Sequence, residues 1–402
     1  MNDPIIQKAD QVIAATYARF PIIIERGKGC TLWDTAGRQY IDFVAGIAVC
    51  NLGHSNSKLI EALIKQAEIL WHVSNLYYTL PQTELAELLI NKSFADRVFF
   101  ANSGAEANEA AIKLARKYFQ DKGENNRFRV IAMKQSFHGR TMATLSATGQ
   151  PKLKLGFDPI LNGFDFVPFN DINALAAKVS SSTSAILIEP VQGEGGVRCP
   201  DSDYLKKVRK LCDETGTLLI LDEIQTGMGR TGKLFGYEHF GIEPDIMTLA
   251  KALGNGLPIG AMLAKEFVAK AFGPGSHAST FGGTPLVTAA ALKVLKIFDE
   301  ENILEHCNDM GSYLKQELMR LKDKYDFIED VRGMGLLLGI KMKFKAGHIV
   351  QDCMEKGFLI NCIQEKILRF VPPLIISKKE IDSLINCLDK IFAGLGKNQP
   401  EN

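Results

Sequence analysis

The sequence predicts an α/β protein in which a mostly parallel central sheet carries helices on both faces and is joined to a smaller α+β domain. Between about residues 98 and 265, short and nearly continuous apolar runs alternate with longer segments of helical periodicity. The two ends of the chain lack this alternation and carry amphipathic stretches instead. At 402 residues, the chain is long enough for about two domains.

Five apolar runs are predicted to be strands. They are nearly free of polar residues, which is typical of strands buried on both faces of a sheet. In chain order they are VFFA (98–101), RVIAM (129–133), AILIEPV (185–191), LLILDE (218–223) and IMTLAKA (246–252). The segments between them place apolar residues on one helical face, for example Ala107, Ala110, Ala111, Leu114 and Tyr118.

The two ends of the chain are predicted to form the smaller domain together. The C-terminal part has amphipathic stretches at 294–319 and 381–395 and a strand-like GLLLGIKM run. We therefore expect residues 1–50 and 286–402 to form the small domain and residues 51–285 the large one. The domains should be tightly joined, because no repeat, low-complexity tract or long linker interrupts the chain.

The composition argues against several classes of function. Forty-seven basic and 46 acidic residues give a formal charge of +1, so no overall field attracts nucleic acid or a membrane. The sequence has no secretory signal and no apolar run near the roughly 18 residues of a membrane span. The eight cysteines lack metal-ligand spacing. We expect a soluble cytoplasmic protein that binds small molecules and no metal.

Polar and glycine-rich segments follow the predicted strands one after another. Ligands of open parallel sheets bind beyond the carboxyl ends of the strands, so these segments are the candidate site. They are residues 103–105, 137–140, 189–196, 222–223 and Lys251. The first begins a helix with a predicted capping box between Ser103 and Glu106. It is either only a well-capped helix or a phosphate site at the open backbone of Gly104 and Ala105.

Asp222 and Lys251 each permit a structural and a functional interpretation. Asp222 ends an apolar run and is either an ion-paired carboxylate or the partner of a protonated ring nitrogen. Lys251 lies among apolar residues and is either a snorkelling lysine or a desolvated amine suited to Schiff-base chemistry. A phosphate site, a ring-nitrogen carboxylate and a Schiff-base lysine at one sheet edge together indicate pyridoxal 5'-phosphate.

Residues 227–232 match a dinucleotide-binding pattern, Gly-x-Gly-x-x-Gly, and nearly match a P-loop. The dinucleotide alternative requires a long helix after the third glycine, but Gly236, Gly241 and Pro244 interrupt that segment. The P-loop alternative requires a hydroxyl where Leu234 stands. A glycine-shaped loop is the better interpretation.

The chain resembles the class III, ornithine-type aminotransferases, which have the aspartate-aminotransferase fold (fold type I of pyridoxal-phosphate enzymes). The resemblance extends from about Phe20 to Ile376. Its most specific stretches are LWHVSNLYYTLPQTELAELL, FFANSGAEANEAAIKLAR, SFHGRT, IEPVQGEGGV, LDEIQTGMGRTGKLF, LAKALGNGLPIGAML, HASTFGGTPL and LRFVPPLII.

The resemblance implies a pyridoxal-phosphate site shared across a homodimer. Lys251 would form the internal aldimine and act with Asp222 in catalysis, with Asp222 at the ring nitrogen. Gln225 would bind the ring hydroxyl. The remaining cofactor-binding residues would be Ser103, Gly104 and Ala105 at the phosphate, Phe137 stacked on the ring with His138 beside it, and Thr280 at the phosphate of the neighbouring subunit.

The resemblance also implies the substrate residues. Arg140 and Arg369 would bind carboxylates. Glu194 would pair with Arg369 when no substrate carboxylate does, and Ser279 would lie near an acylated donor. The expected reaction is ping-pong transfer of the terminal amino group of N2-acetyl-L-ornithine to 2-oxoglutarate in arginine biosynthesis. Ornithine, succinylornithine and 4-aminobutyrate remain alternative donors, and a pyridoxal-phosphate-binding protein without turnover is the non-enzyme alternative.

Overall fold

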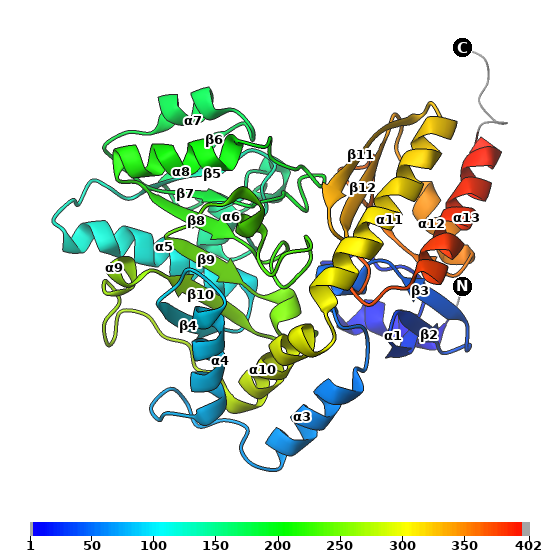
Figure 1. Cartoon of the computed structure of the whole chain (residues 1–402), viewed down its shortest axis with the longest axis horizontal. Helices are drawn as coiled ribbons and strands as arrows, with labels where there is room; N and C mark the ends of the chain where they lie inside the picture. The colour runs from blue at the N-terminus through cyan, green and yellow to red at the C-terminus, as the bar shows by residue number, and fades with distance from the viewer. Residues whose placement is uncertain (1–2, 396–402) are drawn as a thin grey trace.

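A seven-stranded mixed sheet forms the centre of the larger of two lobes in the computed structural model, which describes residues 3–395 (Figure 1). Its strand order is β4-β10-β9-β8-β7-β5-β6. Strands β9, β8, β7, β5 and β6 run parallel, whereas β10 is antiparallel to both of its neighbours. The strands are β4 (Arg97–Ala101), β5 (Arg129–Met133), β6 (Phe164–Val167), β7 (Thr183–Ile188), β8 (Leu218–Asp222), β9 (Ile246–Leu249) and β10 (Gly260–Ala264).

All five predicted strands are present, which confirms the predicted α/β class with a mostly parallel sheet. Two further strands, β6 and β10, were not predicted. The β10 segment, GAMLA, is built from glycine and from residues that favour helices, so its composition does not indicate a strand. The β6 segment, FDFV, is a four-residue edge strand interrupted by Asp165.

Residues of the central strands alternate between two apolar layers. In β8, Leu218 and Ile220 pack in the layer of α5 (Gly104–Asp121) and α6 (Met142–Ala147). Leu219 and Leu221 pack in the layer of α7 (Ile172–Lys178) and α8 (Tyr204–Thr215). This period of two, with both faces covered, explains why the strands appear in the sequence as continuous apolar runs.

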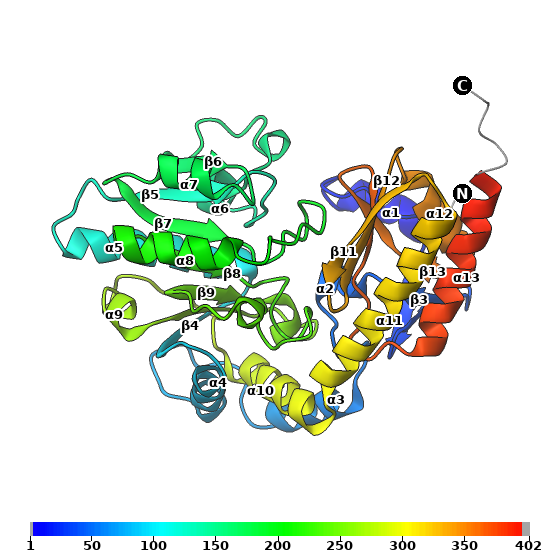
Figure 2. The same ribbon diagram turned by 45° about the horizontal axis from the view of Figure 1, so that its top comes forward.

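The second lobe is assembled from both ends of the chain (Figure 2). One four-stranded sheet contains β1 (Ile24–Lys28), β2 (Thr31–Asp34), β3 (Gln39–Asp42) and β13 (Phe358–Leu359). The other contains β11 (Ile328–Met334), β12 (Leu337–Met342), β15 (Ile367–Phe370) and β14 (Asn361–Ile363). The helices are α1 (Pro4–Val12), α2 (Ala45–Ala48), α11 (Ile303–Lys324), α12 (Gly347–Glu355) and α13 (Lys378–Leu395).

Three helices lie where the lobes meet or at the lower side of the large lobe in Figure 1: α3 (Ser57–Ala67), α4 (Leu80–Asn91) and α10 (Pro285–Glu300). Helix α10 packs against both α3 and α4. The amphipathic stretch predicted at 294–319 therefore covers the end of α10 and most of α11, with a break near Glu301. The short α9 (Glu266–Ala269) borders α5. The domain boundaries at residues 50 and 285 stay predictions.

Across residues 3–395, no helix combines the length and the apolar character that crossing a bilayer requires.

Candidate active site

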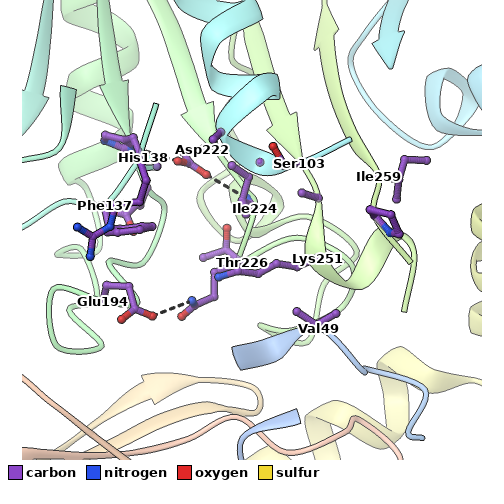
Figure 3. Close-up of a pocket in the computed structure, with 18 of the residues that line it drawn as sticks. Val49, Ser103, Phe137, His138, Glu194, Asp222, Ile224, Thr226, Lys251 and Ile259 are labelled. Atoms are coloured by element: carbon purple, nitrogen blue, oxygen red, sulfur yellow. Dashed lines mark hydrogen bonds and ion pairs between the residues drawn. The ribbon is translucent and has the colours of Figure 1, made fainter. Parts of the chain in front are cut away.

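A cavity of about 470 Å³ opens at the carboxyl ends of the parallel strands, facing the second lobe (Figure 3). It brings together segments that are far apart in the sequence: the start of α5 and the loops that follow β5, β7, β8 and β9. The predicted residues that line it are Ser103, Gly104, Ala105, Phe137, His138, Arg140, Glu194, Asp222, Gln225 and Lys251.

Helix α5 begins at the cavity wall. Ser103 is its N-cap, and the Ser103 Oγ accepts a hydrogen bond from the Glu106 N–H at 3.2 Å. The Glu106 carboxylate reaches back to the N–H of Asn102 rather than of Ser103, so the predicted box closes one residue earlier. A Cβ on Gly104 would fall 2.7 Å from the Ile224 side chain, so glycine permits this close packing. The first N–H groups of the helix have no acceptor within the helix and suit an anion.

Asp222 ends β8 and is nearly fully buried. Its Oδ2 accepts a hydrogen bond from Asn108 Nδ2 at 2.8 Å and contacts His138 Nδ1 at 2.7 Å, and its Oδ1 accepts from the Ile224 N–H at 3.1 Å. The buried His138 Nε2 has no hydrogen-bond partner within residues 3–395, so we assign the proton to Nδ1, from which it is donated to Asp222. Among residues 3–395 no lysine or arginine pairs with Asp222, which leaves its charge available to a cation in the cavity.

Lys251 begins a 3-10 turn directly after β9 and projects into the cavity (Figure 3). Its backbone has a φ of +46°, a left-handed conformation that is strained for a residue with a side chain. Burial lowers the pKa of Lys251 to about 8, although the carboxylates of Glu194 and Asp222 oppose this shift. No hydrogen bond or ion pair to its Nζ is found within residues 3–395. The site thus holds an amine that is partly neutral near pH 8.

Arg369 and Glu194 meet at the boundary of the lobes. Arg369 lies in β15 and is fully buried. Its Nη1 lies 2.5 Å from Glu194 Oε1, and its Nε donates to Asn361 Oδ1 at 3.2 Å. Burial raises the pKa of Glu194, but Arg369 and Lys251 lower it by more, so the pKa is below its ordinary value. Gln225 contacts both partners, at 3.3 Å and 3.5 Å.

Arg140 is exposed at the rim of the cavity. Its guanidinium lies 5.7 Å from the centre of the Phe137 ring. Within the described part of the chain it forms no ion pair. It is therefore a cation available to an incoming anion.

Ser279 and Thr280 lie outside this cavity. They line two other cavities, of about 520 and 810 Å³, beside Asn102, Asn75 and Phe281. Ser279 Oγ accepts hydrogen bonds from Asn102 Nδ2 at 3.2 Å and from the Gly282 N–H at 2.9 Å. Thr280 is exposed. A single chain therefore does not bring these two residues together with Asp222 and Lys251.

Sequence reasoning missed two polar residues of the site. Asn108 lies inside α5 and anchors Asp222, and its helical position gave no signal of a role. Glu189 follows β7, lines the cavity and accepts a hydrogen bond from the Phe137 N–H at 3.2 Å. The sequence places Glu189 at a strand end but does not show that its carboxylate meets the Phe137 backbone.

The glycine-rich loop at residues 227–232 does not lead into a long helix, as a dinucleotide-binding loop would. The element that follows it is a short 3-10 turn, Gly236–Phe240. The loop residue Arg230 is fully buried and joins the lobes. Arg230 Nη1 donates to the carbonyl groups of Leu336 at 3.0 Å and Pro372 at 2.6 Å, and Nη2 donates to Asn51 Oδ1. The loop therefore ties the two lobes together.

This fold and site define an aminotransferase: the Lys251 amine, whose pKa is lowered, and the buried Asp222 carboxylate, which has no lysine or arginine partner within residues 3–395, line one cavity at the carboxyl ends of the parallel strands. The chain belongs to the family "Aminotransferase class-III", which matches residues 12–392. An acetylornithine aminotransferase of Methanocaldococcus jannaschii is 51% identical over 95% of this chain and 96% of its own length. That of Gloeobacter violaceus is 52% identical over 97% and 98%.

Solved structures agree with this assignment. The ornithine aminotransferase of Toxoplasma gondii superposes with a TM-score of 0.95 at 32% identity, covering 98% of this chain and 96% of that one. The N-acetylornithine aminotransferase of Stenotrophomonas maltophilia gives a TM-score of 0.85 at 38% identity, covering 98% and 100%. Another structure of the T. gondii enzyme has pyridoxal phosphate at partial occupancy in its active site.

The cavity fits pyridoxal phosphate on structural grounds. A buried carboxylate without a lysine or arginine partner suits a protonated ring nitrogen, and the start of α5 suits a phosphate. Lys251 offers the amine for the covalent bond. The unpartnered Nη2 of Arg369 suits a substrate carboxylate.

Proposed function

We propose that this chain is an acetylornithine aminotransferase of arginine biosynthesis in the cytoplasm. It transfers the terminal amino group of N2-acetyl-L-ornithine to 2-oxoglutarate and forms N-acetyl-L-glutamate 5-semialdehyde and L-glutamate. The observation that carries the proposal is the unpaired Lys251 amine facing Asp222 in one cavity. The choice of substrate is supported by the names of relatives about 50% identical over nearly the whole chain.

Pyridoxal phosphate, when bound, supplies an electron sink for the carbon that loses its proton. Asp222 stabilises the positive charge of the ring nitrogen, and His138 and Asn108 hold the Asp222 carboxylate in place. Gly104 and Ala105 would bind the phosphate through their backbone, and Phe137 would pack on the ring. Lys251 would hold the cofactor through Nζ, and the same atom, as a neutral amine, would accept the proton of the substrate carbon.

Two arginines bind the substrate carboxylates. Arg140 at the rim holds the distal carboxylate of either substrate, because its guanidinium is exposed and unpaired. Arg369 holds the carboxylate beside the keto group of 2-oxoglutarate, and Glu194 neutralises Arg369 when the donor is bound. One cavity can in this way accept two substrates of different charge.

We also propose that two chains form a dimer and share their active sites. Large apolar side chains stand exposed at Phe281 and along residues 71–80, and two of them, Leu76 and Phe281, line cavities together with Ser279 and Thr280. The exposed side chains are Trp71, Leu76, Tyr77, Tyr78, Leu80 and Phe281. Tyr78 is fully exposed, which is unfavourable unless a partner covers it. Thr280 would then reach the phosphate in the partner's cavity, which accounts for its place outside its own.

A donor panel tests the choice of substrate. Purified enzyme loaded with pyridoxal phosphate is assayed with acetylornithine, succinylornithine, ornithine and 4-aminobutyrate against 2-oxoglutarate. The proposal predicts the highest kcat/KM for acetylornithine. A higher value for unacylated ornithine would overturn the substrate assignment but leave the aminotransferase class intact.

A further inference from the structure

Two carboxyl groups stand side by side at the ends of neighbouring strands. Glu189 directly follows β7, and Asp222 is the last residue of β8. The residues that precede them, Ile188 and Leu221, are partners in the parallel register. Glu189 is 6% exposed and Asp222 3%, and both line the cavity. The cavity therefore has a second buried acid with no role in the chemistry described above.

The two acids differ in their hydrogen bonds. Asp222 has three polar neighbours, whereas Glu189 has one: its Oε2 accepts from the Phe137 N–H at 3.2 Å. The other oxygen of Glu189, Oε1, has no hydrogen-bond partner within residues 3–395. A buried carboxylate with one donor beside a second carboxylate is less stable than the neutral acid, because charge in a site of low polarity requires compensation.

The charged groups around Glu189 come from three segments. Asp222 faces it from β8, Glu194 from the loop after β7, and Lys251 from the turn after β9. Burial and then the Asp222 charge raise the pKa of Glu189 well above its ordinary value. The Phe137 N–H and Lys251 oppose this shift. Arg369 compensates Glu194 instead, through their ion pair.

We propose that Glu189 is a positioning residue that keeps its proton at neutral pH, so that its carbonyl oxygen fixes the Phe137 backbone while its uncharged hydroxyl faces the cofactor. This inference rests on the proposed function and deepens it. Asp222 then remains the one carboxylate that sets the charge of the ring. A second anion beside it would favour the protonated form of Lys251, which must be neutral to react.

The test compares Glu189→Gln with the wild type, using pyridoxamine phosphate as the probe, because this compound binds without a covalent bond to Lys251. Glutamine keeps an acceptor for the Phe137 N–H and mimics the neutral acid at every pH. Dissociation constants are measured by fluorescence titration of the apoprotein from about pH 6 to about pH 10. The ratio of wild-type to variant constants should stay near one from about pH 6 through neutral pH, and it should change by at most about tenfold for each pH unit above the pH at which Glu189 ionises.

Two outcomes would overturn the inference. A ratio far from one at every pH would mean that Glu189 is already ionised at neutral pH. A ratio of one at every pH would overturn it when the infrared difference spectrum between the wild type and Glu189→Gln also lacks the carbonyl stretch of a protonated carboxyl group, because Glu189 would then be ionised without effect on the cofactor. Glu189→Leu separates the two roles, since leucine is neutral but offers no acceptor to Phe137. Compared with Glu189→Gln, it should weaken binding of the probe by the same factor at all pH values. Failure of the wild type to bind the probe would instead contradict the proposed function.

Discussion

Arg369 Nη1 lies 2.5 Å from Glu194 Oε1, in an ion pair that joins β15 of the second lobe to the loop after β7 of the large lobe. The Arg369 side chain is fully buried, whereas that of Glu194 is 28% exposed. We propose that a substrate carboxylate replaces Glu194 at the buried guanidinium, so that the pair acts as a switch between two substrates of different charge.

Glu194→Gln tests this switch. Glutamine cannot neutralise Arg369, so the guanidinium is free to bind the carboxylate of 2-oxoglutarate. When the amino donor is bound instead, the Arg369 charge stays buried without a partner, which destabilises that complex. We expect the KM for 2-oxoglutarate to fall and the KM for acetylornithine to rise by about tenfold, a change equal to about 1.4 kcal/mol. Initial rates at varied concentrations of each substrate provide the measurement. An equal change in both KM values would contradict the switch.

The lowered pKa of Lys251 predicts a pH dependence for cofactor attachment. The neutral amine is the nucleophile, so the rate of attachment to the apoprotein should rise with pH below about 8 and level off above it. A lysine with an ordinary pKa would give a rate that still rises near pH 10. Stopped-flow absorbance measures the rate. Borohydride trapping followed by mass spectrometry should place the cofactor on Lys251, and Lys251→Ala should trap none.

Asp222→Asn should remove most of the activity. An amide cannot stabilise a protonated ring nitrogen, and its NH2 group would oppose the donors of Asn108 and His138. We expect kcat to fall by about 100-fold or more, as for the loss of other electrostatic groups of active sites. Thr248→Val is the matched control. It removes only the 2.8 Å bond from Thr248 Oγ1 to Asn108 Oδ1, one step further from the cavity, and should cost less than tenfold.

Tyr78→Asp should convert the proposed dimer into monomers. A carboxylate at this fully exposed position would be buried without a partner in the interface. Light scattering at micromolar concentration should report half the mass, and activity should fall with it because Thr280 no longer completes the neighbouring site. Met319→Asp, at an exposed apolar residue of α11, should leave the mass unchanged. A dimer that persists with Tyr78→Asp would contradict the proposed interface.

The sequence could predict elements whose signal is local. The buried parallel strands appear as apolar runs. The helix start at Ser103 appears as a capping pattern, of which the structure confirms the Ser103 cap, whereas the Glu106 carboxylate binds the N–H of Asn102 instead of that of Ser103. The antiparallel β10 could not be predicted, because its strand state depends on hydrogen bonds to β4 and β9 rather than on its own residues.

The side chains of the site likewise divide into those with a local sequence signal and those whose position depends on tertiary structure. Strand-end positions identified Asp222 and Lys251, because the edge of a parallel sheet collects such residues. The supports of Asp222 could not be inferred in this way, since Asn108 comes from a helix interior. The neighbouring positions of Glu189 and Asp222 could not be inferred either, because they depend on the register of β7 and β8. The place of Ser279 and Thr280 outside the cavity also depends on tertiary structure.

We propose that Lys251 and Asp222 form the site of an aminotransferase specific for acetylornithine, and a single half-reaction tests this proposal. Enzyme loaded with pyridoxal phosphate is mixed with acetylornithine alone, and the absorbance of the bound cofactor is followed. We expect a rapid loss of the long-wavelength band with one equivalent of semialdehyde formed per site, and restoration of the band by 2-oxoglutarate. A band that stays unchanged with acetylornithine while the cofactor remains bound would contradict it.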